Sequence, residues 1–176
     1  MSREYAESLI ATIPDYPTPG VVFKDLTPVF SETAALEWVL TECARHFGQA
    51  GITRIAGIEA RGFILGAALA GHMNVGFVPI RKAGKLPRAT FGVEYALEYG
   101  TDTLEIHQDA LQKSDVVLLV DDVLATGGTA TAAASLIERC HATVAGLAVL
   151  LDLDFLGGHD RFAREYPKTE VFTVFA

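Results

Sequence analysis

The chain of 176 residues has few cysteines and no long hydrophobic run. Its two cysteines, Cys43 and Cys140, are far apart and neither belongs to a Cys-x-x-Cys pair, which argues against a disulfide framework or a cysteine-bound metal. The longest apolar stretch, Val144–Leu151, has only the length of a strand, so no membrane span is predicted. Met1–Tyr5 lacks the apolar core of a signal peptide, and we therefore expect a cytoplasmic protein.

Positive charge is also scarce. The chain carries 14 Lys and Arg against 22 Asp and Glu, a formal net charge of −8. This balance argues against general nucleic-acid binding, so no nucleic-acid partner is expected. An anionic ligand would need a local cluster of cations or backbone amides. The five histidines are scattered, and no cluster of His or Cys predicts a zinc site.

Apolar runs alternate with helix-like segments along most of the chain. The expected strands are Arg54–Ile58, Gly76–Ile80, Val116–Val120, Val144–Leu151 and Val171–Phe175. The expected helices are Arg3–Ile13, Thr33–Phe47, Phe63–Met73 and Thr129–Cys140. This alternation predicts one α/β domain with a mostly parallel central sheet covered by helices on both faces. Between Ala83 and Lys113, glycines, a proline and polar residues predict a hairpin or a lid.

Three of the expected strands end in polar groups. These are Glu59-Ala60-Arg61-Gly62, Arg81-Lys82 and Asp121-Asp122. In a parallel sheet, ligands bind beyond the carboxyl ends of the strands, so we expect the three groups to face one crevice. The alternative for Arg81-Lys82 and for Asp121-Asp122 is a solvated strand end.

The most informative stretch runs from Val116 to Thr129. Five apolar residues are followed by Asp121-Asp122 and then by the small, glycine-rich turn Ala125-Thr126-Gly127-Gly128-Thr129. Carboxylates accept hydrogen bonds from a sugar diol, and glycine amides at a helix start can converge on a phosphate. The spacing is neither GxxxxGK nor GxGxxG. A plain strand-to-helix turn would not require two threonines around two glycines.

This stretch resembles the phosphoribosyl pyrophosphate (PRPP) signature of the type I phosphoribosyltransferases. Within that family the chain is similar to the adenine phosphoribosyltransferases, and the matching pieces are Ile13–Asp25, Ala60–Phe63, Arg81–Pro87, Leu97–Gly100 and Leu104–His107. The resemblance implies the type I phosphoribosyltransferase fold in a single domain over residues 1–176. A small N-terminal hood over about residues 1–33 and a flexible lid loop over about residues 84–96 would complete it.

The resemblance also implies a reaction, in purine salvage. The 5-phosphoribosyl group of PRPP would move to N9 of adenine and form AMP and pyrophosphate, in a homodimer that needs Mg²⁺. PRPP and water would hold most of the Mg²⁺ coordination sphere, with no direct protein ligand. Two readings stay open beside this one: a phosphoribosyltransferase for another purine, and a non-catalytic PRPP-binding regulator.

Each part of PRPP has a matching set of residues. The ribose hydroxyls would meet Asp121 and Asp122. The 5′-phosphate would bind to Ala125, Thr126, Gly127, Gly128 and Thr129. The pyrophosphate would meet Ala60, Arg61, Arg81, Lys82 and Lys85. In the family, the turn that matches Glu59-Ala60 can hold an unusual peptide geometry.

Adenine has its own set of residues in the resemblance. Glu98 matches the family's proposed acid–base residue, which handles the proton that leaves the purine. Val22 and Lys24 would present main-chain groups to the Watson–Crick edge, and Phe23 would stack on the base. From local sequence alone, the alternative for Glu98 is a surface acid on a hairpin, and the alternative for Val22–Lys24 is an ordinary loop.

Overall fold

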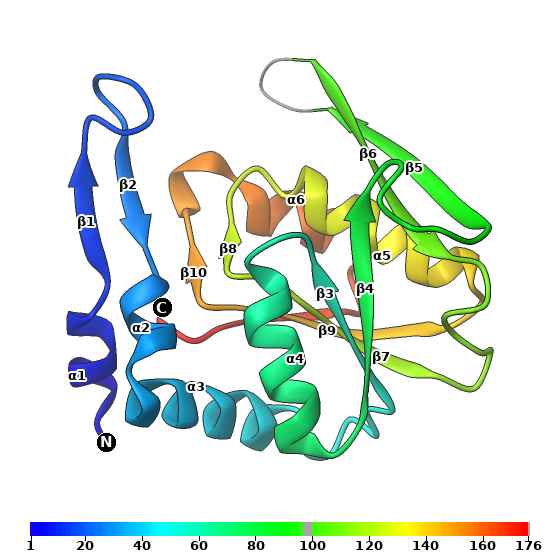
Figure 1. The fold of residues 1–176 in the computed structure, drawn as a ribbon, viewed down its shortest axis with the longest axis horizontal. Coiled ribbons are helices and arrows are strands. Elements are labelled where there is room, and N and C mark those ends of the chain that lie inside the picture. Colours follow the sequence, from blue (N-terminus) through cyan, green and yellow to red (C-terminus); the bar gives the residue numbers. More distant parts are fainter. Residues whose placement is uncertain (97–99, 176) are drawn as a thin grey trace.

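The computed structural model describes residues 1–96 and 100–175, in which helices alternate with strands (Figure 1). The helices are α1 Arg3–Ser8, α2 Thr27–Ser31, α3 Thr33–His46, α4 Gly62–Met73, α5 Gly128–Arg139, the short 3₁₀ helix η1 Asp154–Leu156, and α6 Gly158–Glu165. The strands are β1 Ala11–Pro14, β2 Val22–Asp25, β3 Arg54–Ile58, β4 Gly76–Lys82, β5 Thr90–Ala96, β6 Thr101–His107, β7 Val116–Val120, β8 Val123–Leu124, β9 Thr143–Val149, β10 Leu151–Asp152 and β11 Glu170–Thr173. None of these helices is long and apolar enough to cross a membrane.

Within the described residues, seven strands form the central sheet in the order β11-β9-β7-β3-β4-β6-β5. The pairs from β11 to β4 are parallel, whereas β6 pairs antiparallel with both β4 and β5. The mostly parallel α/β sheet expected from the sequence is confirmed, with an antiparallel hairpin at one edge. This order places the carboxyl ends of β3, β4 and β7 side by side, where ligands bind in such sheets.

Helices cover both faces of the sheet, and each face has its own buried core. On one face, Val117 and Leu119 of β7 pack with α5 and with Phe162 of α6. On the other face, Leu118 and Val120 of β7 pack with α3 and α4. Successive side chains of a strand point to opposite faces, so burial on both faces requires the unbroken apolar run that the sequence shows.

Helix α4 lies close to β3 and β4 because glycines occupy the contact. A Cβ atom on Gly57 would lie 2.8 Å from the carbonyl oxygen of Gly62, and one on Gly66 would lie 2.9 Å from the ring of Phe77. Larger residues would push the helix away from the sheet. The close packing therefore fixes the turn between β3 and α4, which carries Arg61.

The main elements lie where the sequence predicts them. The strands expected over residues 54–58, 76–80, 116–120, 144–151 and 171–175 are present as β3, β4, β7, β9 and β11. The helices expected over residues 33–47, 63–73 and 129–140 are present as α3, α4 and α5. The expected strand over 144–151 is divided, because β9 ends at Val149 and Leu151 begins β10, which pairs with β8.

The N-terminal helix is shorter than the expected Arg3–Ile13. It ends at Ser8, and Ala11–Pro14 forms β1, which pairs antiparallel with β2. Pro14 has no amide hydrogen, and a proline disfavours the helical conformation of the residue before it. The β1–β2 hairpin rises beside the rest of the molecule, on top of α1 and α2 (Figure 1).

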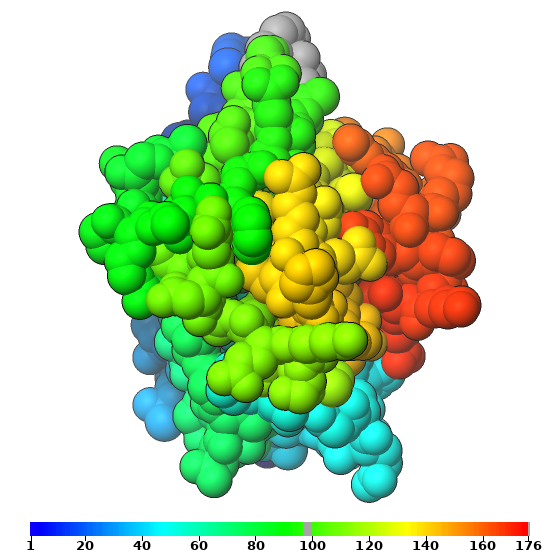
Figure 2. Space-filling view, turned by 90° about the vertical axis from the view of Figure 1, so that its right-hand side faces the viewer, coloured from blue at the N-terminus to red at the C-terminus, as the bar shows by residue number. Residues whose placement is uncertain are grey.

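Residues 83–113 contain the expected hairpin, made of β5 and β6. The region expected as a lid, 84–96, is therefore a loop only as far as Ala89, since Thr90–Ala96 is strand β5. Half-buried residues such as Val93 and Tyr95 alternate with exposed ones along β5, the pattern of a strand with one covered face. Figure 2 shows this hairpin beside α5, with the C-terminal segment on the other side of that helix.

Candidate active site

The ends of neighbouring strands bring acidic and basic side chains into contact. Nε of Arg61, after β3, lies 2.7 Å from Oδ2 of Asp122, after β7. Nε of Arg81, on β4, donates a hydrogen bond to Oε2 of Glu59 at 3.1 Å. The three polar strand ends predicted to share a crevice are thus in contact: the end of β4 contacts the end of β3, and the end of β3 contacts the end of β7.

The carboxylates of Asp121 and Asp122 are adjacent and poorly solvated. The Asp122 amide donates to Oδ1 of Asp121 at 2.9 Å. Burial raises the pKa of Asp121 well above its usual range, and the neighbouring charge of Asp122 raises it further. Burial also raises the pKa of Asp122, although the Arg61 guanidinium opposes this shift. Ligand hydroxyls or a cation would stabilise the charged forms of both groups.

The contact between Arg61 and Asp122 is short but poorly aligned. Oδ2 of Asp122 is buried and accepts no hydrogen bond of good geometry from the described residues. An acceptor in this state gains from a ligand that offers hydrogen-bond donors. A hydroxyl pair of a sugar has that chemistry.

The turn Ala125–Thr129 begins helix α5 and presents free amides. Gly127 caps the helix with φ of 77°, a conformation that favours glycine. Among the described residues, the amides of Thr126 and Gly127 donate to no other protein group. The first amides of α5 have no partner within the helix, and its N-terminus carries partial positive charge. The turn can therefore hold a phosphate.

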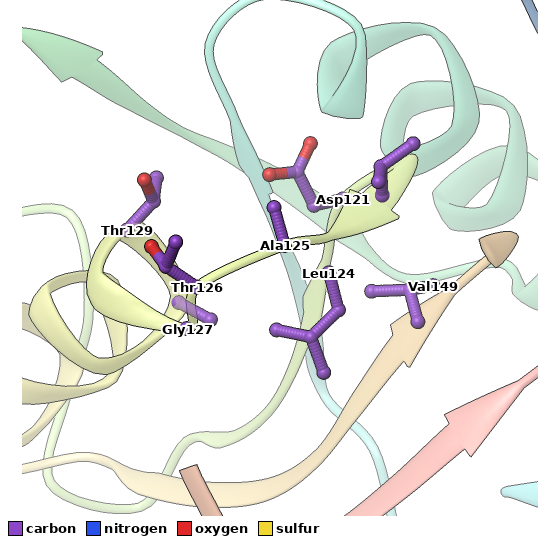
Figure 3. A pocket seen from close by; sticks show the side chains of 9 residues that line it. Asp121, Leu124, Ala125, Thr126, Gly127, Thr129 and Val149 are labelled. Atoms are coloured by element: carbon purple, nitrogen blue, oxygen red, sulfur yellow. The ribbon is translucent and has the colours of Figure 1, made fainter. Parts of the chain in front are cut away.

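A small pocket of about 70 Å³ lies between this turn and the acidic pair. Its lining includes Asp121, Leu124, Thr126, Gly127 and Thr129. In Figure 3 the Asp121 carboxylate and the hydroxyls of Thr126 and Thr129 lie on one side of the strand and Leu124 on the other. The pocket thus places the Asp121 carboxylate beside the turn that begins α5.

Two basic residues of the site, Arg81 and Lys82, are each held by an acidic one. Glu59 accepts hydrogen bonds from the Arg81 side chain and from the Lys82 amide, and the Arg81 contact holds the pKa of Glu59 below its usual value. Nζ of Lys82 lies 2.9 Å from Oδ2 of Asp102 on β6. The Lys85 carbonyl accepts a hydrogen bond from Arg81 at 3.1 Å. The peptide bond between Glu59 and Ala60 is cis.

Strand β2 brings an aromatic ring to the same crevice. The Arg61 guanidinium carbon lies 5.4 Å from the centre of the Phe23 ring, and Tyr16 packs edge-on against that ring at 5.2 Å. The Val22 side chain is exposed, and Nζ of Lys24 donates to the Thr12 hydroxyl on β1. The Lys24 side chain is thus occupied within the hairpin.

Glu98, the expected acid–base residue, lies outside the described residues, so the structure does not place it. Tyr95, three residues earlier in the sequence, is placed, and its side chain interacts with that of Thr129. A Cβ atom on Gly128 would lie 3.2 Å from the carbonyl oxygen of Ala96. The end of β5 therefore lies against the start of α5.

The donor set favours a hard cation that is bound mainly by its ligand. Among residues 1–96 and 100–175, no group of three or more His, Cys, Asp or Glu side chains is arranged to hold a metal. The oxygens of Asp121 and Asp122 are of the type that Mg²⁺ prefers, and Mg²⁺ usually keeps several waters and substrate oxygens. These two residues fit Mg²⁺ contacted through water.

The contacts of three residues around the site were not predicted from sequence, although Glu59 and Gly62 belong to a strand-end group that was expected to face the crevice. Glu59 orients Arg81 and Lys82, and Asp102 holds Lys82. Gly62 leaves room for the acidic pair, because a Cβ atom there would lie 2.9 Å from Oδ1 of Asp121. The Glu59 position beside Arg61 was visible in the sequence, but a pairing across strands was not.

Comparison with known families agrees with this geometry. The family described as "Phosphoribosyl transferase domain" matches residues 34–175. An adenine phosphoribosyltransferase of Nocardioides sp. is 54% identical over 173 residues, which covers 96% of this chain and 93% of the relative. One of Francisella tularensis subsp. holarctica is 52% identical over 165 residues and covers 93% and 94%.

Solved structures give the same picture. The adenine phosphoribosyltransferase of Thermoanaerobacter pseudethanolicus superposes with a TM-score of 0.91 at 42% identity, over 98% of each chain. The Giardia lamblia enzyme, solved with 9-deazaadenine, has a TM-score of 0.90 at 42% identity and covers 97% of this chain and 96% of that one.

Proposed function

This chain belongs to the adenine phosphoribosyltransferase family, and we propose that it transfers the 5-phosphoribosyl group of PRPP to N9 of adenine. The products are AMP and pyrophosphate, a purine salvage reaction. The observation that carries the proposal is the Arg61–Asp122 contact of 2.7 Å, which joins the basic end of the crevice to the acidic pair and the glycine-rich turn. One PRPP molecule carries a pyrophosphate, ribose hydroxyls and a 5′-phosphate, so it needs the basic end, the acidic pair and the glycine-rich turn together.

PRPP extends along the crevice in the proposed complex. The 5′-phosphate lies on the turn Ala125–Thr129, and the ribose hydroxyls donate to Asp121 and Asp122. The pyrophosphate meets Ala60 and Arg61 and the basic group Arg81, Lys82 and Lys85. Charge-assisted hydrogen bonds of this kind contribute about 1.5–3 kcal/mol each, which suits a highly charged substrate.

The residues around the ribose must protect a reactive centre during the transfer. The C1′–O bond breaks with its electron pair leaving on pyrophosphate, and N9 of adenine forms the new bond to C1′. Positive charge builds on the ribose, so the site must exclude water. We assign this exclusion to a hood over residues 1–33 and a lid over residues 84–96, within one domain of residues 1–176.

Adenine lies under the β1–β2 hairpin in this proposal. Phe23 stacks on the base, while main-chain groups of Val22 and Lys24 read its Watson–Crick edge. Glu98 handles the proton that N9 loses and needs a pKa raised toward neutrality to do so. Tyr95, three residues before Glu98 in the sequence, lies beside Thr129, so the hairpin runs toward the substrate.

Mg²⁺ accompanies PRPP in the proposed complex. Asp121 and Asp122 would hold it through water, because their carboxylates are the oxygen ligands of this site. The ion would supply positive charge that offsets the charge of the leaving pyrophosphate. We also propose a cytoplasmic homodimer, in which a basic lid residue reaches the partner's site.

The decisive test is turnover of defined bases. Purified protein would be incubated with Mg²⁺, PRPP and one of adenine, guanine, hypoxanthine or xanthine, and the nucleotide product separated and identified. We expect AMP from adenine, little product from the other bases and none when Mg²⁺ is chelated. Strong turnover of guanine with none of adenine would overturn the base assignment, and PRPP binding without any turnover would indicate a regulator.

A further inference from the structure

Two glycines far apart in the sequence lie in direct contact behind the glycine-rich turn. A Cβ atom on Gly127 would lie 2.7 Å from the carbonyl oxygen of Gly158, the first residue of α6. A Cβ atom on Gly158 would overlap the carbonyl oxygen of Ala125 and lie 2.9 Å from the Gly127 amide nitrogen. The atoms on both sides are backbone atoms, which cannot turn aside as a flexible side chain can.

This contact bears on the shape of the turn. Gly127 adopts a φ of 77° and caps α5, so its conformation sets the direction of the amides of Thr126 and Gly127. Any side chain at position 158 would displace Ala125 and Gly127 together. The amides that converge on an anion would then point elsewhere.

The first turn of α6, which carries Gly158, is held in place by contacts with its neighbours. Phe162, one turn along α6, is completely buried and stacks on Tyr166. Next to Gly158, Nδ1 of His159 lies 3.3 Å from Oδ2 of Asp152 on β10. Strand β10 pairs in turn with β8, which leads into the glycine-rich turn. The first turn of α6 and the anion-binding turn are therefore fixed to each other at two places.

A cation on the same helix also reaches the turn. Nη1 of Arg161 lies 3.2 Å from the position of a Cβ atom on Gly128, the first residue of α5. The positive end of a helix repels a cation unless an anion is present. Arg161 pairs with Glu165 at 3.6 Å, and both side chains are partly exposed, so this pair neutralises it weakly. A phosphate on the turn would relieve the repulsion.

We infer that the first turn of α6 is part of the 5′-phosphate site: Gly158 is a positioning residue that fixes the shape of the Ala125–Thr129 turn, and Arg161 adds positive charge beside it. The inference rests on the proposed function, which assigns the 5′-phosphate to that turn. It gives the C-terminal segment, which carries no recognisable sequence motif, a specific task in binding PRPP and AMP.

The test compares two ligands that differ only in the phosphate. AMP and adenosine would be titrated by calorimetry into the parent protein, into Gly158→Ala, and into the control Gly71→Ala. Gly71 is on α4, and a Cβ atom there meets nothing within 4 Å. We expect Gly158→Ala to lose about tenfold or more of its affinity for AMP and to keep its affinity for adenosine, with Gly71→Ala unchanged for both.

The outcomes distinguish the assignment of the turn to the 5′-phosphate from the positioning role of Gly158. If the parent protein binds AMP no better than adenosine, the assignment of the turn to the 5′-phosphate fails. If the parent prefers AMP and folded Gly158→Ala keeps that preference, the positioning role of Gly158 is overturned. The same shape change predicts a raised KM for PRPP with kcat less affected, a split that general loss of stability would not produce.

A second variant keeps the test decisive if Gly158→Ala does not fold. Arg161→Gln removes the charge and leaves a shorter polar side chain at a partly exposed position. We expect a several-fold loss of AMP affinity that shrinks at high salt, and no change for adenosine. Equal loss for both ligands, or no loss for AMP, would remove α6 from the phosphate site.

Discussion

Arg61 and Asp122 contact each other at 2.7 Å, although they are expected to serve opposite ends of PRPP. Arg61 belongs to the proposed pyrophosphate set and Asp122 to the ribose set. The Asp122 side chain is 5% exposed and the Arg61 side chain 39%, so the carboxylate is shielded from water while the guanidinium is partly open to it. Contacts from PRPP would compete with this pair, and any weakening of the pair would reduce the free energy gained from those contacts.

The first prediction concerns the ribose contact of Asp122. Asp122→Asn keeps the shape of the side chain but removes the charge that strengthens hydrogen bonds from ribose hydroxyls. A loss of about 1.5–3 kcal/mol corresponds to roughly 10- to 100-fold weaker PRPP binding, measurable by calorimetry. Asp109→Asn is the matched control, because Asp109 pairs with Arg88 on the exposed lid. Unchanged PRPP affinity in both Asp121→Asn and Asp122→Asn would contradict the ribose assignment.

The second prediction concerns the stability of the empty protein. The pKa of Asp121 is raised by burial and by the charge of Asp122. Between the pKa of an unfolded aspartate and the raised folded value, the folded chain binds more protons, so the free energy of unfolding falls as pH rises. Asp121→Asn removes this penalty. We expect its Tm to exceed that of the parent near neutral pH by a few degrees, at about 2–4 °C per kcal/mol, while PRPP binding weakens.

Asp115→Asn is the control for this prediction, because its expected change in Tm has the opposite sign. Burial raises the pKa of Asp115, but hydrogen bonds from the Gln112 amide and the Thr53 hydroxyl outweigh it, and the pKa is lowered. Its contribution to stability is present above the unfolded pKa and is lost as pH falls through the folded value. Asp115→Asn should therefore lower the Tm near neutral pH. The gain in Asp121→Asn should vanish near about pH 4, where aspartates in an unfolded chain are half protonated; a gain that persists there would show a cause other than charge.

The sequence predicted the parts of the site that depend on local order. The run Val116–Val120 followed by two acids and a glycine-rich turn specifies a buried strand, a strand end and a helix start. Each follows from neighbouring residues. The parallel sheet then places Arg61 and Asp122 at one edge, because strand ends of a parallel sheet lie together.

The parts that could not be predicted depend on contacts between distant segments. Glu59 holds Arg81 across two strands, and Gly158 touches Gly127 from a helix that was not expected at all. Gly157-Gly158 resembles a helix breaker in sequence, yet Gly157 caps α6 with φ of 68°. The residue types in one segment do not indicate which distant segment of the backbone will pack against it.

The third prediction tests Glu98. Glu98→Ala removes the proposed acid–base group, and general acid–base catalysis contributes about 10²- to 10⁴-fold to a rate. We expect kcat to fall within that range while PRPP affinity is nearly unchanged. Glu94→Ala is the matched control, an exposed acid on β5, four residues earlier in the sequence. Collapse of PRPP affinity with the saturated rate intact would assign Glu98 to substrate binding instead.

The last prediction concerns the hood. The Phe23 ring faces the Arg61 guanidinium at 5.4 Å and is backed by Tyr16, so it is held where a base can stack on it. Stacking of a base on an aromatic side chain contributes about 1–3 kcal/mol by alanine substitution, so Phe23→Ala should raise the KM for adenine roughly 5- to 100-fold. Phe23→Tyr keeps the ring and should restore most of the affinity, while Val21→Ala, on the same hairpin, should change little. If all three variants bind adenine alike, the base does not stack on Phe23, and the proposed main-chain reading by Val22 and Lys24 loses its support, because stacking is what holds the base at their level.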